Sequence, residues 1–302
     1  MEAELEGKTR LRAWWRQLRI HQWSKNLLLF VPMLAAHALE TPDLWLRTLA
    51  GALMLSLVAS ATYIFNDWLD LRGDQLVPGK RDRPLASGQL HPQAVSFAGW
   101  ILFLAGLSGA LLLDPLFCLL LWGYAVTSIV YSTFLKRILL LDVLVLSGMY
   151  LWRLGMGAQL AEVPLSPWFL GFAQFFFLSL ALAKRYSELV LEAREGVANH
   201  IRRPYRNNDL PVIMAFGTGS ALVAVLILAL YISSDQSQVL YTSPGLLWLL
   251  CPVMLYWLAR IWFKTHRGEL LTDPVLFALR DRASHAVLLL LVVIGLLASL
   301  VN

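Results

Sequence analysis

The sequence predicts an all-helical membrane protein with nine transmembrane helices, and three observations support this fold class. Of the 302 residues, 58% are hydrophobic and only 15% are charged, which is more apolar side chain than one globular core can bury. The apolar residues gather in runs of roughly 20, the length that crosses the hydrocarbon core of a bilayer. The basic residues between these runs fall almost entirely on one side of the expected bundle.

The nine expected helices follow one another along nearly the whole chain. The first is short and contains Pro32, and the interfacial residue Trp23 precedes it. The basic segment from Lys8 to Arg19 leads to no small-residue cleavage site, so we expect no cleavable signal peptide. We expect one integral membrane domain over residues 1–302, with 1–23 as a basic N-terminal segment. The expected spans are residues 26–40, 44–66, 94–113, 115–135, 138–158, 166–184, 212–232, 245–263 and 285–301.

The lysines and arginines predict an orientation, because loops that remain in the cytoplasm are enriched in them. With nine spans, 23 of the 25 basic residues fall on one side, and only Arg47 and Arg153 do not. We therefore expect an inner-membrane protein with a cytoplasmic N-terminus and an external C-terminus. The long loops at 67–93, 185–211 and 264–284 then face the cytoplasm, and we expect the polar chemistry there.

Three aspartates follow the second expected span. Asp67, Asp70 and Asp74 are three and four residues apart, a spacing that places them on one face of a helix. Like charges placed in this way repel one another unless a cation lies between them. Carboxylates combined with substrate phosphate oxygens are typical ligands of magnesium, so the motif predicts a magnesium site. The alternative is an ordinary solvated helix end.

A basic loop begins six residues after the last of these aspartates. Lys80, Arg81 and Arg83 precede Pro84, and this composition indicates a constrained loop rather than a helix. Guanidinium groups beside a metal site suit a polyphosphate whose other oxygens bind the metal. The alternative is a loop that only sets the membrane orientation, but such a loop needs no acidic face beside it.

The cytoplasmic end of the sixth expected span carries Lys184, Arg185 and Glu188. Lys184 and Glu188 are four residues apart and could simply form a pair on the helix surface. The functional interpretation makes Glu188 a second acidic wall that faces the aspartates. Lys184 and Arg185 then bind phosphate oxygens.

Arg153 lies well within the fifth expected span. A charge at this depth is costly and usually faces a cavity or a partner, and a buried structural ion pair is the alternative. Weaker signals occur at the ends of other spans, where interfacial anchoring is an equally good explanation. These residues are Gln22, Lys25, Asn26, Tyr131, Lys136, Arg280 and Asp281.

Taken together, these residues resemble the UbiA-type superfamily of intramembrane prenyltransferases. The hallmark Asn-Asp-x-x-Asp-x-x-x-Asp of that superfamily runs from Asn66 to Asp74. Within the superfamily, the chain is most similar to the branch that contains decaprenyl-phosphate phosphoribosyltransferases. The matching segments are Gln22 to Asn26, Lys80 to Pro84, Tyr131 with Leu135 and Lys136, Arg153, Lys184 to Glu188, and Ala278 to Arg282.

The resemblance implies a UbiA-type bundle around a central cavity that opens to the cytoplasm. It implies a Mg2+-dependent transfer of phosphoribose from phosphoribosyl diphosphate to a polyprenyl phosphate, with release of diphosphate. The implied metal ligands are Asp67, Asp70, Asp74 and Glu188, and Arg153 joins them as a catalytic residue. The implied substrate-binding residues are Gln22, Lys25, Asn26, Asn66, Lys80, Arg81, Arg83, Tyr131, Lys136, Lys184, Arg185, Tyr186, Arg280 and Asp281.

Two other functions stay open at this point. One is a prenyltransferase that moves a prenyl group from a prenyl diphosphate to an aromatic or other small acceptor. The other is a non-catalytic lipid carrier or transporter, which explains an acidic helix end of the metal-binding type poorly. We expect no nucleic-acid partner, and the sequence leaves open whether the chain forms a homo-oligomer.

Overall fold

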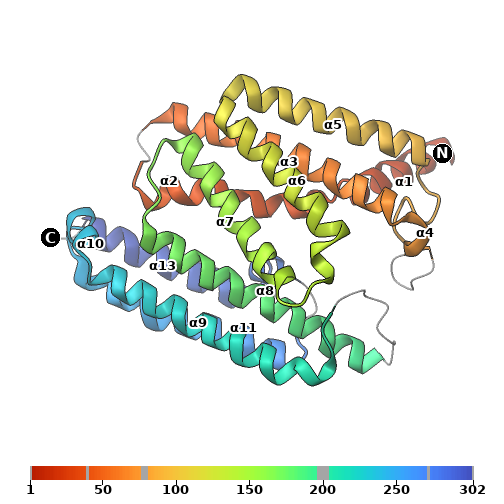
Figure 1. Ribbon diagram of the computed structural model, residues 1–302. Coiled ribbons are helices and arrows are strands. Elements are labelled where there is room, and N and C mark those ends of the chain that lie inside the picture. Colours follow the sequence, from red (N-terminus) through yellow and green to blue (C-terminus); the bar gives the residue numbers. More distant parts are fainter. Residues whose placement is uncertain (1, 39–40, 76–80, 196–203, 271–272, 301–302) are drawn as a thin grey trace. The chain divides into compact units, whose positions relative to one another are not determined.

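The computed structural model describes residues 2–38, 41–75, 81–195, 204–270 and 273–300, and this part of the chain is helical, without any strand (Figure 1). The predicted all-α class is therefore confirmed. The α-helices are α1 (Glu2–Gln17), α2 (Val31–Ala35), α3 (Pro42–Leu69), α4 (Leu71–Asp74), α5 (Pro92–Leu113), α6 (Pro115–Thr133), α7 (Leu141–Ala161), α8 (Pro167–Glu195), α9 (Leu210–Ile232), α10 (Asp235–Leu240), α11 (Leu250–His266), α12 (Pro274–Ala278) and α13 (Arg282–Leu300). The 3-10 helices are η1 (Ile20–Phe30), η2 (Leu135–Arg137), η3 (Asn207–Asp209) and η4 (Pro244–Leu249).

Proline begins several of the long helices, including α3, α5, α6 and α8. The first turn of a helix does not use the backbone N–H that proline lacks, and the fixed φ of proline already suits a helix. The start of α6 is also capped, because the Asp114 side chain accepts a hydrogen bond from the backbone N–H of Phe117 at 2.6 Å. These local signals explain why the helix starts could be read from the sequence.

The chain forms two compact units. Unit 1 consists of Met1–Lys136 and Trp152–Pro164, and unit 2 consists of Arg137–Leu151 and Leu165–Asn302. Helix α7 therefore contributes its beginning to unit 2 and its end to unit 1.

In unit 1, α3 packs closely against α5, and the two helices run side by side in Figure 1. Two glycines of α5 allow this approach. A Cβ atom at Gly99 would lie 2.9 Å from the side chain of Ile64, and one at Gly106 would lie 2.6 Å from that of Val58. Small residues at such contacts are typical of helix pairs in membranes, where close van der Waals packing replaces the hydrophobic effect.

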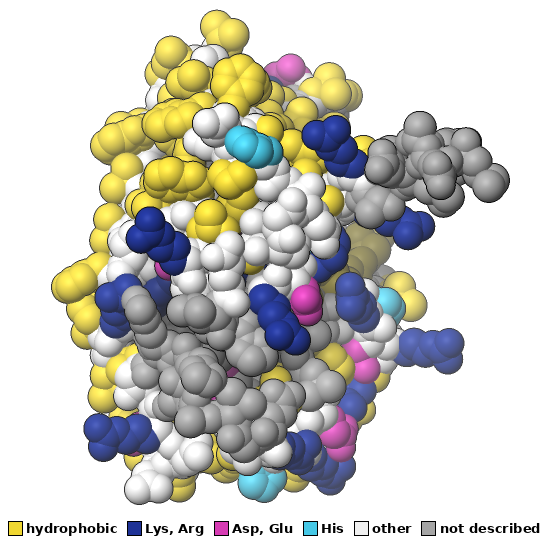
Figure 2. Space-filling model, turned by 90° about the vertical axis from the view of Figure 1, so that its right-hand side faces the viewer, with side chains coloured by type: hydrophobic (Ala, Val, Ile, Leu, Met, Phe, Trp, Pro, Cys, Tyr) yellow, Lys and Arg dark blue, Asp and Glu magenta, His cyan; other side chains and the backbone are white. Residues whose placement is uncertain are grey.

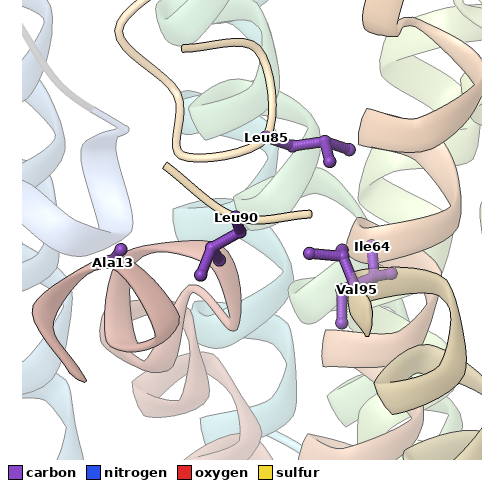
Figure 3. Packing of buried hydrophobic residues seen from close by; sticks show 5 residues of the cluster. All are labelled: Ala13, Ile64, Leu85, Leu90 and Val95. Carbon is purple, nitrogen blue, oxygen red and sulfur yellow. The ribbon is translucent and has the colours of Figure 1, made fainter. Parts of the chain in front are cut away.

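A cluster of five buried hydrophobic residues lies at one end of α3 (Figure 3). It joins α1, α3 and α5 to the segment before α5, and each of its side chains is at most 3% exposed. A fully buried leucine contributes about 2 kcal/mol, so this cluster holds the segment that carries Arg81 and Arg83 against α3. Its members are Ala13, Ile64, Leu85, Leu90 and Val95.

In unit 2, α8 packs against α9 and α11. The Trp262 Nε1–H donates to the Ser179 hydroxyl at 2.9 Å, and that hydroxyl donates to the Gly217 carbonyl at 2.8 Å. Gly217 leaves room for the indole, because a Cβ at this position would lie 2.0 Å from the Trp262 ring. The contact therefore fixes three helices around one tryptophan.

Within the described residues, seven helices are long and apolar enough to cross a membrane, namely α3, α5, α6 with η2, α8, η3 with α9, η4 with α11, and α13. Their surfaces are apolar, and Leu112 of α5 is 89% exposed. This surface suits lipid, so the protein is an integral membrane protein. Nine spans were predicted, and the remaining two are α7, which contains the charged residues Asp142 and Arg153, and the first predicted span.

The first predicted span, residues 26–40, is not one continuous α-helix. Its start belongs to η1, and among its described residues, 26–38, Val31–Ala35 are the α-helical ones. Pro32 lies in the first turn of α2. Because proline has no N–H to donate, the hydrogen-bond pattern of η1 does not continue through this position.

Arg47 is one of the two basic residues that the predicted orientation does not place on the cytoplasmic side. In unit 1 it forms an ion pair with Glu162, and its Nη2 lies 3.9 Å from Asp114 Oδ2. This charge is thus neutralised locally, which explains why it does not follow the pattern of the others.

Candidate functional site

Helix α3 presents one polar stripe along its length. Ser56, Ser60, Tyr63 and Asp67 are four, three and four residues apart, so they share one helix face. The segment from residue 17 to residue 26 lies along this stripe. Its contacts are Asn26 Nδ2 to Ser56 Oγ at 2.8 Å, Trp23 Nε1 to Ser60 Oγ at 3.0 Å, the Arg19 guanidinium over the Tyr63 ring at 4.9 Å, and Gln17 Nε2 to Asp67 Oδ2 at 3.1 Å.

Two buried carboxylates and two guanidinium groups meet where the stripe ends, and we call Asp67, Asp74, Arg19 and Arg83 the aspartate–arginine cluster. Asp67 is 4% exposed and Asp74 is 3% exposed. Nη1 of Arg83 lies 3.0 Å from Asp67 Oδ1 and 2.6 Å from Asp74 Oδ2. Nη2 of Arg19 lies 2.6 Å from Asp67 Oδ1. The structure thus brings predicted residues from the acidic motif and the basic loop together.

Asp70, the second aspartate of the motif, lies outside this cluster. Helix α3 ends at Leu69, and Asp70 at its C-cap has φ −89° and ψ 2°, outside the α-helical region. The helical spacing that would align all three carboxylates is therefore interrupted. The Asp70 side chain is 42% exposed, and its Oδ2 lies 3.6 Å from Nζ of Lys136.

The cluster offers two of the carboxylates that a divalent cation would need. Asp67 and Asp74 both bond one nitrogen of Arg83, so a positive charge already lies between two buried carboxylates. Across the part of the chain that is described, no three His, Cys, Asp or Glu side chains converge on one point. A magnesium ion here would therefore complete its shell with phosphate oxygens and water, as it does in many phosphate-binding sites.

The remaining residues of the predicted site in unit 1 occupy varied places. Arg81 is exposed two residues before Arg83, whereas Lys80 lies outside the described residues. Lys25 is 9% exposed in η1. Partly buried positions are held by Gln22 in η1, Asn66 in α3, Tyr131 in α6 and Lys136 in η2.

Arg153 is 5% exposed and joins three elements of unit 1. Its Nε donates to the Asn26 side-chain oxygen at 3.3 Å, its Nη2 donates to the Tyr124 hydroxyl, and its guanidinium lies 4.9 Å from the Tyr124 ring centre. Asn26 also bonds Ser56, which lies about 16 Å along α3 from the level of Asp67. At this distance the Arg153 guanidinium does not contact a group held by Asp67. These contacts give Arg153 a structural role in unit 1, and its catalytic role stays a prediction.

In unit 2, Arg185 is a buried ion-pair residue and is 1% exposed. Its Nε lies 2.9 Å from Asp142 Oδ2, and its Nη1 pairs with Glu188 one turn further along α8. The Tyr205 hydroxyl donates to the other Asp142 oxygen at 2.5 Å. Burial raises the pKa of Tyr205, and the hydrogen bond to Asp142 raises it further, so this hydroxyl keeps its proton.

The neighbours of Arg185 on α8 also bind other elements of unit 2. Nζ of Lys184 lies 3.1 Å from Asp273 Oδ2, just before α12. The Tyr186 hydroxyl lies 2.9 Å from Nδ1 of His266 at the end of α11. The predicted alternative, a Lys184–Glu188 pair, does not describe this structure, because each of the two side chains bonds a different residue.

Asp281 links the end of α11 to the start of α13. Arg260 donates two hydrogen bonds to it, at 2.7 and 2.9 Å, and the Ser284 backbone N–H donates a third at 2.8 Å. These contacts, with Arg260 the largest cause, hold the pKa of Asp281 at about 2. The predicted substrate-binding residue Asp281 is thus a helix cap and an ion-pair partner, and Arg280 beside it is exposed.

We expect Asp281→Asn to lower the free energy of unfolding by about 2 kcal/mol, the order for breaking a partly buried charge-assisted pair. The folded pKa is below the unfolded value of 3.8. The contribution is therefore complete above that value and is lost as pH falls toward 2. Thermal unfolding in detergent at several pH values checks this. A variant whose unfolding temperature matches the wild type at pH 7 would contradict it.

Sequence reasoning missed several residues that the structure brings to these clusters. Arg19 and Gln17 contact Asp67 from about 50 residues away, and Arg19 had been counted only as an orienting charge. The sequence does contain one signal for a buried ion pair. Asp142 is an acidic residue at the start of an apolar span. Such a charge needs a partner, and Arg185 is that partner.

Basic side chains are prominent on the surface that Figure 2 draws, where Lys and Arg outnumber the acidic side chains. This agrees with the formal net charge of +5. A basic surface of this kind attracts phosphate-bearing substrates and anionic lipid headgroups.

Residues 27–281 match the UbiA prenyltransferase family. The chain is 37% identical over 275 residues to the uncharacterized protein y4nM of Sinorhizobium fredii, covering 91% of this chain but only 53% of that protein. It is 31% identical over 293 residues to the nodulation protein NoeC of Azorhizobium caulinodans, covering 94% of this chain and 90% of that protein. It is 29% identical over 272 residues to decaprenyl-phosphate phosphoribosyltransferase of Mycobacterium tuberculosis, covering 88% and 87%.

The fold also matches a solved structure. A UbiA homologue from Archaeoglobus fulgidus, bound to DMAPP and Mg2+, aligns with a TM-score of 0.67 at 15% identity, over 95% of this chain and 99% of that one. The chain is therefore a membrane transferase that belongs to the UbiA prenyltransferase family and lies near its decaprenyl-phosphate phosphoribosyltransferase branch.

Proposed function

We propose that the protein transfers phosphoribose from phosphoribosyl diphosphate to a polyprenyl phosphate. A phosphate oxygen of the lipid attacks C1 of the ribose, and the bond between C1 and the diphosphate oxygen breaks. The diphosphate leaves with the electron pair. The acceptor is already an anion near neutral pH, so the reaction needs electrostatic stabilisation more than a general base.

The observation that carries this proposal is the aspartate–arginine cluster. Two buried carboxylates and two guanidinium groups within hydrogen-bonding distance form a site for a metal-bound diphosphate. The relatives named decaprenyl-phosphate phosphoribosyltransferase support the choice of donor, because the match covers most of both chains.

We propose Asp67 and Asp74 as the principal magnesium ligands, with Asp70 as an outer one. When bound, the ion neutralises charge on the leaving diphosphate. Arg83 and Arg19 then exchange their aspartate partners for diphosphate oxygens, so the cluster keeps its charges compensated before and after binding. Both aspartates are buried, so little water surrounds the carboxylates that would hold the ion. Glu188 is proposed as the metal-binding carboxylate of unit 2.

The choice between a phosphoribosyl and a prenyl donor depends on the number of cationic groups. Phosphoribosyl diphosphate has a second anionic end, its 5-phosphate, which needs further positive charge. Arg81 is exposed and lies two residues before Arg83, so it can supply such a charge in unit 1. A prenyl donor would place hydrocarbon where the 5-phosphate binds and would leave such charges without a ligand.

We further propose nine membrane crossings with the N-terminus in the cytoplasm. In addition to the seven apolar helices, α7 has 21 residues. A 3-10 helix rises about 2 Å per residue, so η1 extends about 22 Å and α2 adds about 7 Å. Together they approach the hydrocarbon thickness of about 30 Å. The distribution of 23 of the 25 basic residues supports this orientation.

Replacing Arg81 tests the donor. We expect Arg81→Ala to weaken binding of phosphoribosyl diphosphate about tenfold and to leave binding of free diphosphate nearly unchanged, because only the former has a 5-phosphate. Calorimetric titration in the presence of magnesium measures both affinities. Arg72→Ala, at an exposed arginine of α4, is the matched control. Equal losses for the two ligands would favour a prenyl diphosphate donor.

A further inference from the structure

We infer that Asp142 and Tyr205 are positioning residues that orient the Glu188 carboxylate through Arg185. The inference rests on the proposed role of Glu188 as a metal-binding carboxylate, and neither residue belongs to a motif named above. All four side chains belong to unit 2.

The contacts form a continuous chain from the loop before α9 to the surface of α8. The Tyr205 hydroxyl donates to Asp142 Oδ1 at 2.5 Å, and Asp142 Oδ2 lies 2.9 Å from Nε of Arg185. Nη1 of Arg185 pairs with Oε2 of Glu188. Each side chain is thus held by the one before it.

Burial determines what Arg185 does. Its side chain is 2% exposed and that of Asp142 is 0% exposed, so neither charge is solvated by water. If the Arg185 guanidinium left to bind a substrate phosphate, the buried Asp142 carboxylate would lose this ion pair, at a cost of several kcal/mol. We infer that Arg185 stays in place and acts on Glu188, whereas the sequence alone predicts that it binds phosphate oxygens.

Among these four contacting residues, Glu188 is the one that reaches the surface, since its side chain is 30% exposed. Arg185 lies three residues earlier on the same helix face. Pairing one carboxylate oxygen with a buried guanidinium restricts the rotamer of Glu188 while the carboxylate remains accessible to a ligand. Outer contacts that orient a ligating carboxylate in this way commonly change metal affinity by about 10- to 100-fold.

Tyr205 also fixes the backbone on which Asp142 stands. Its hydroxyl accepts a hydrogen bond from the Leu140 N–H at 3.3 Å. Leu140 has a φ of 64°, a left-handed conformation that is unfavourable for leucine and needs such support. The hydroxyl of Tyr205 thus holds both the Asp142 side chain and the turn before it.

The test is binding of Mn2+ with inorganic diphosphate to the purified protein, measured by calorimetry. Both candidate donors contain the diphosphate group, so the result does not depend on donor identity. We expect Tyr205→Phe to weaken this binding at least about tenfold. Tyr231→Phe is the matched control, because it removes a hydroxyl that bonds Tyr241 at the other end of α9 in the same unit. We expect this control to bind like the wild type and to unfold at a temperature close to that of Tyr205→Phe.

A double-mutant cycle shows whether the effect passes through Glu188. In a Glu188→Gln background, Tyr205→Phe and Asp142→Asn should cause no further loss of binding, because the carboxylate that they position is gone. Additive losses would overturn the inference, and so would wild-type binding by Tyr205→Phe alone. A wild-type protein that fails to bind Mn2+ with diphosphate would contradict the proposed function, and with it the inference.

Discussion

Asp67→Asn and Asp74→Asn should each lower turnover on the order of 10³-fold while the protein remains folded. Asparagine keeps the volume of aspartate but removes the charge that a magnesium ion and two arginines require. Both carboxylates are buried and bond the same nitrogen of Arg83, so neither can substitute for the other. Initial rates measured over a series of magnesium concentrations check this prediction.

Two further aspartates calibrate the result. Asp70→Asn should have a smaller effect, because its side chain is 42% exposed and lies beside Lys136. Asp43→Asn, at an exposed position in the first turn of α3, should have none. Near-normal, magnesium-dependent activity of the Asp67 or Asp74 variant would refute the assignment of the site.

Arg153→Ala should lower the free energy of unfolding by about 3 kcal/mol. The change leaves the Tyr124 hydroxyl and the Asn26 side-chain oxygen without the guanidinium that they bond, in a region where Arg153 is 5% exposed. Arg153→Lys should restore only part of this stability, since one ammonium cannot reproduce the fork of an arginine. Thermal or denaturant unfolding in detergent measures the loss.

The sequence-based interpretation gives Arg153 a different role and predicts a different result. An arginine that binds the acceptor phosphate would yield a lysine variant with normal stability but impaired use of the polyprenyl phosphate. Arg137→Ala, at an exposed arginine, is the stability control and should unfold like the wild type. A stable Arg153→Ala protein that loses only acceptor affinity would return Arg153 to the catalytic residues.

Features that depend on local sequence were predictable. Runs of apolar residues gave the seven long helices, and prolines marked several of their starts. The acidic motif and the basic loop were both recognised, and Asp67, Asp74 and Arg83 do meet. These three side chains come together because few residues separate them along the sequence.

Features that depend on where a helix ends were harder to predict. The spacing of the aspartates assumes one continuous helix, but α3 stops at Leu69 and Asp70 turns toward Lys136. The first predicted span is apolar enough, yet its first five residues, 26–30, belong to a 3-10 helix. Hydropathy reports composition and not the hydrogen-bond pattern, so it could not distinguish these cases.

Contacts between distant segments could not be predicted from spacing at all. Arg19 lies 48 residues from Asp67, and Tyr205 lies 63 residues from Asp142. The sequence predicts that Arg185 binds phosphate oxygens because it lies beside Glu188 at the cytoplasmic end of an expected span. Only the fold shows that it is buried beside Asp142.

Product analysis is the most direct test of the proposed function. Purified protein is incubated with magnesium, a polyprenyl phosphate and phosphoribosyl diphosphate, and the extracted lipid is analysed by mass spectrometry. We predict a lipid heavier than the acceptor by one phosphoribosyl group, with one diphosphate released for each lipid formed and about 10³-fold slower product formation by Asp67→Asn. A lipid product that forms only when a prenyl diphosphate and an aromatic acceptor are supplied would contradict the account.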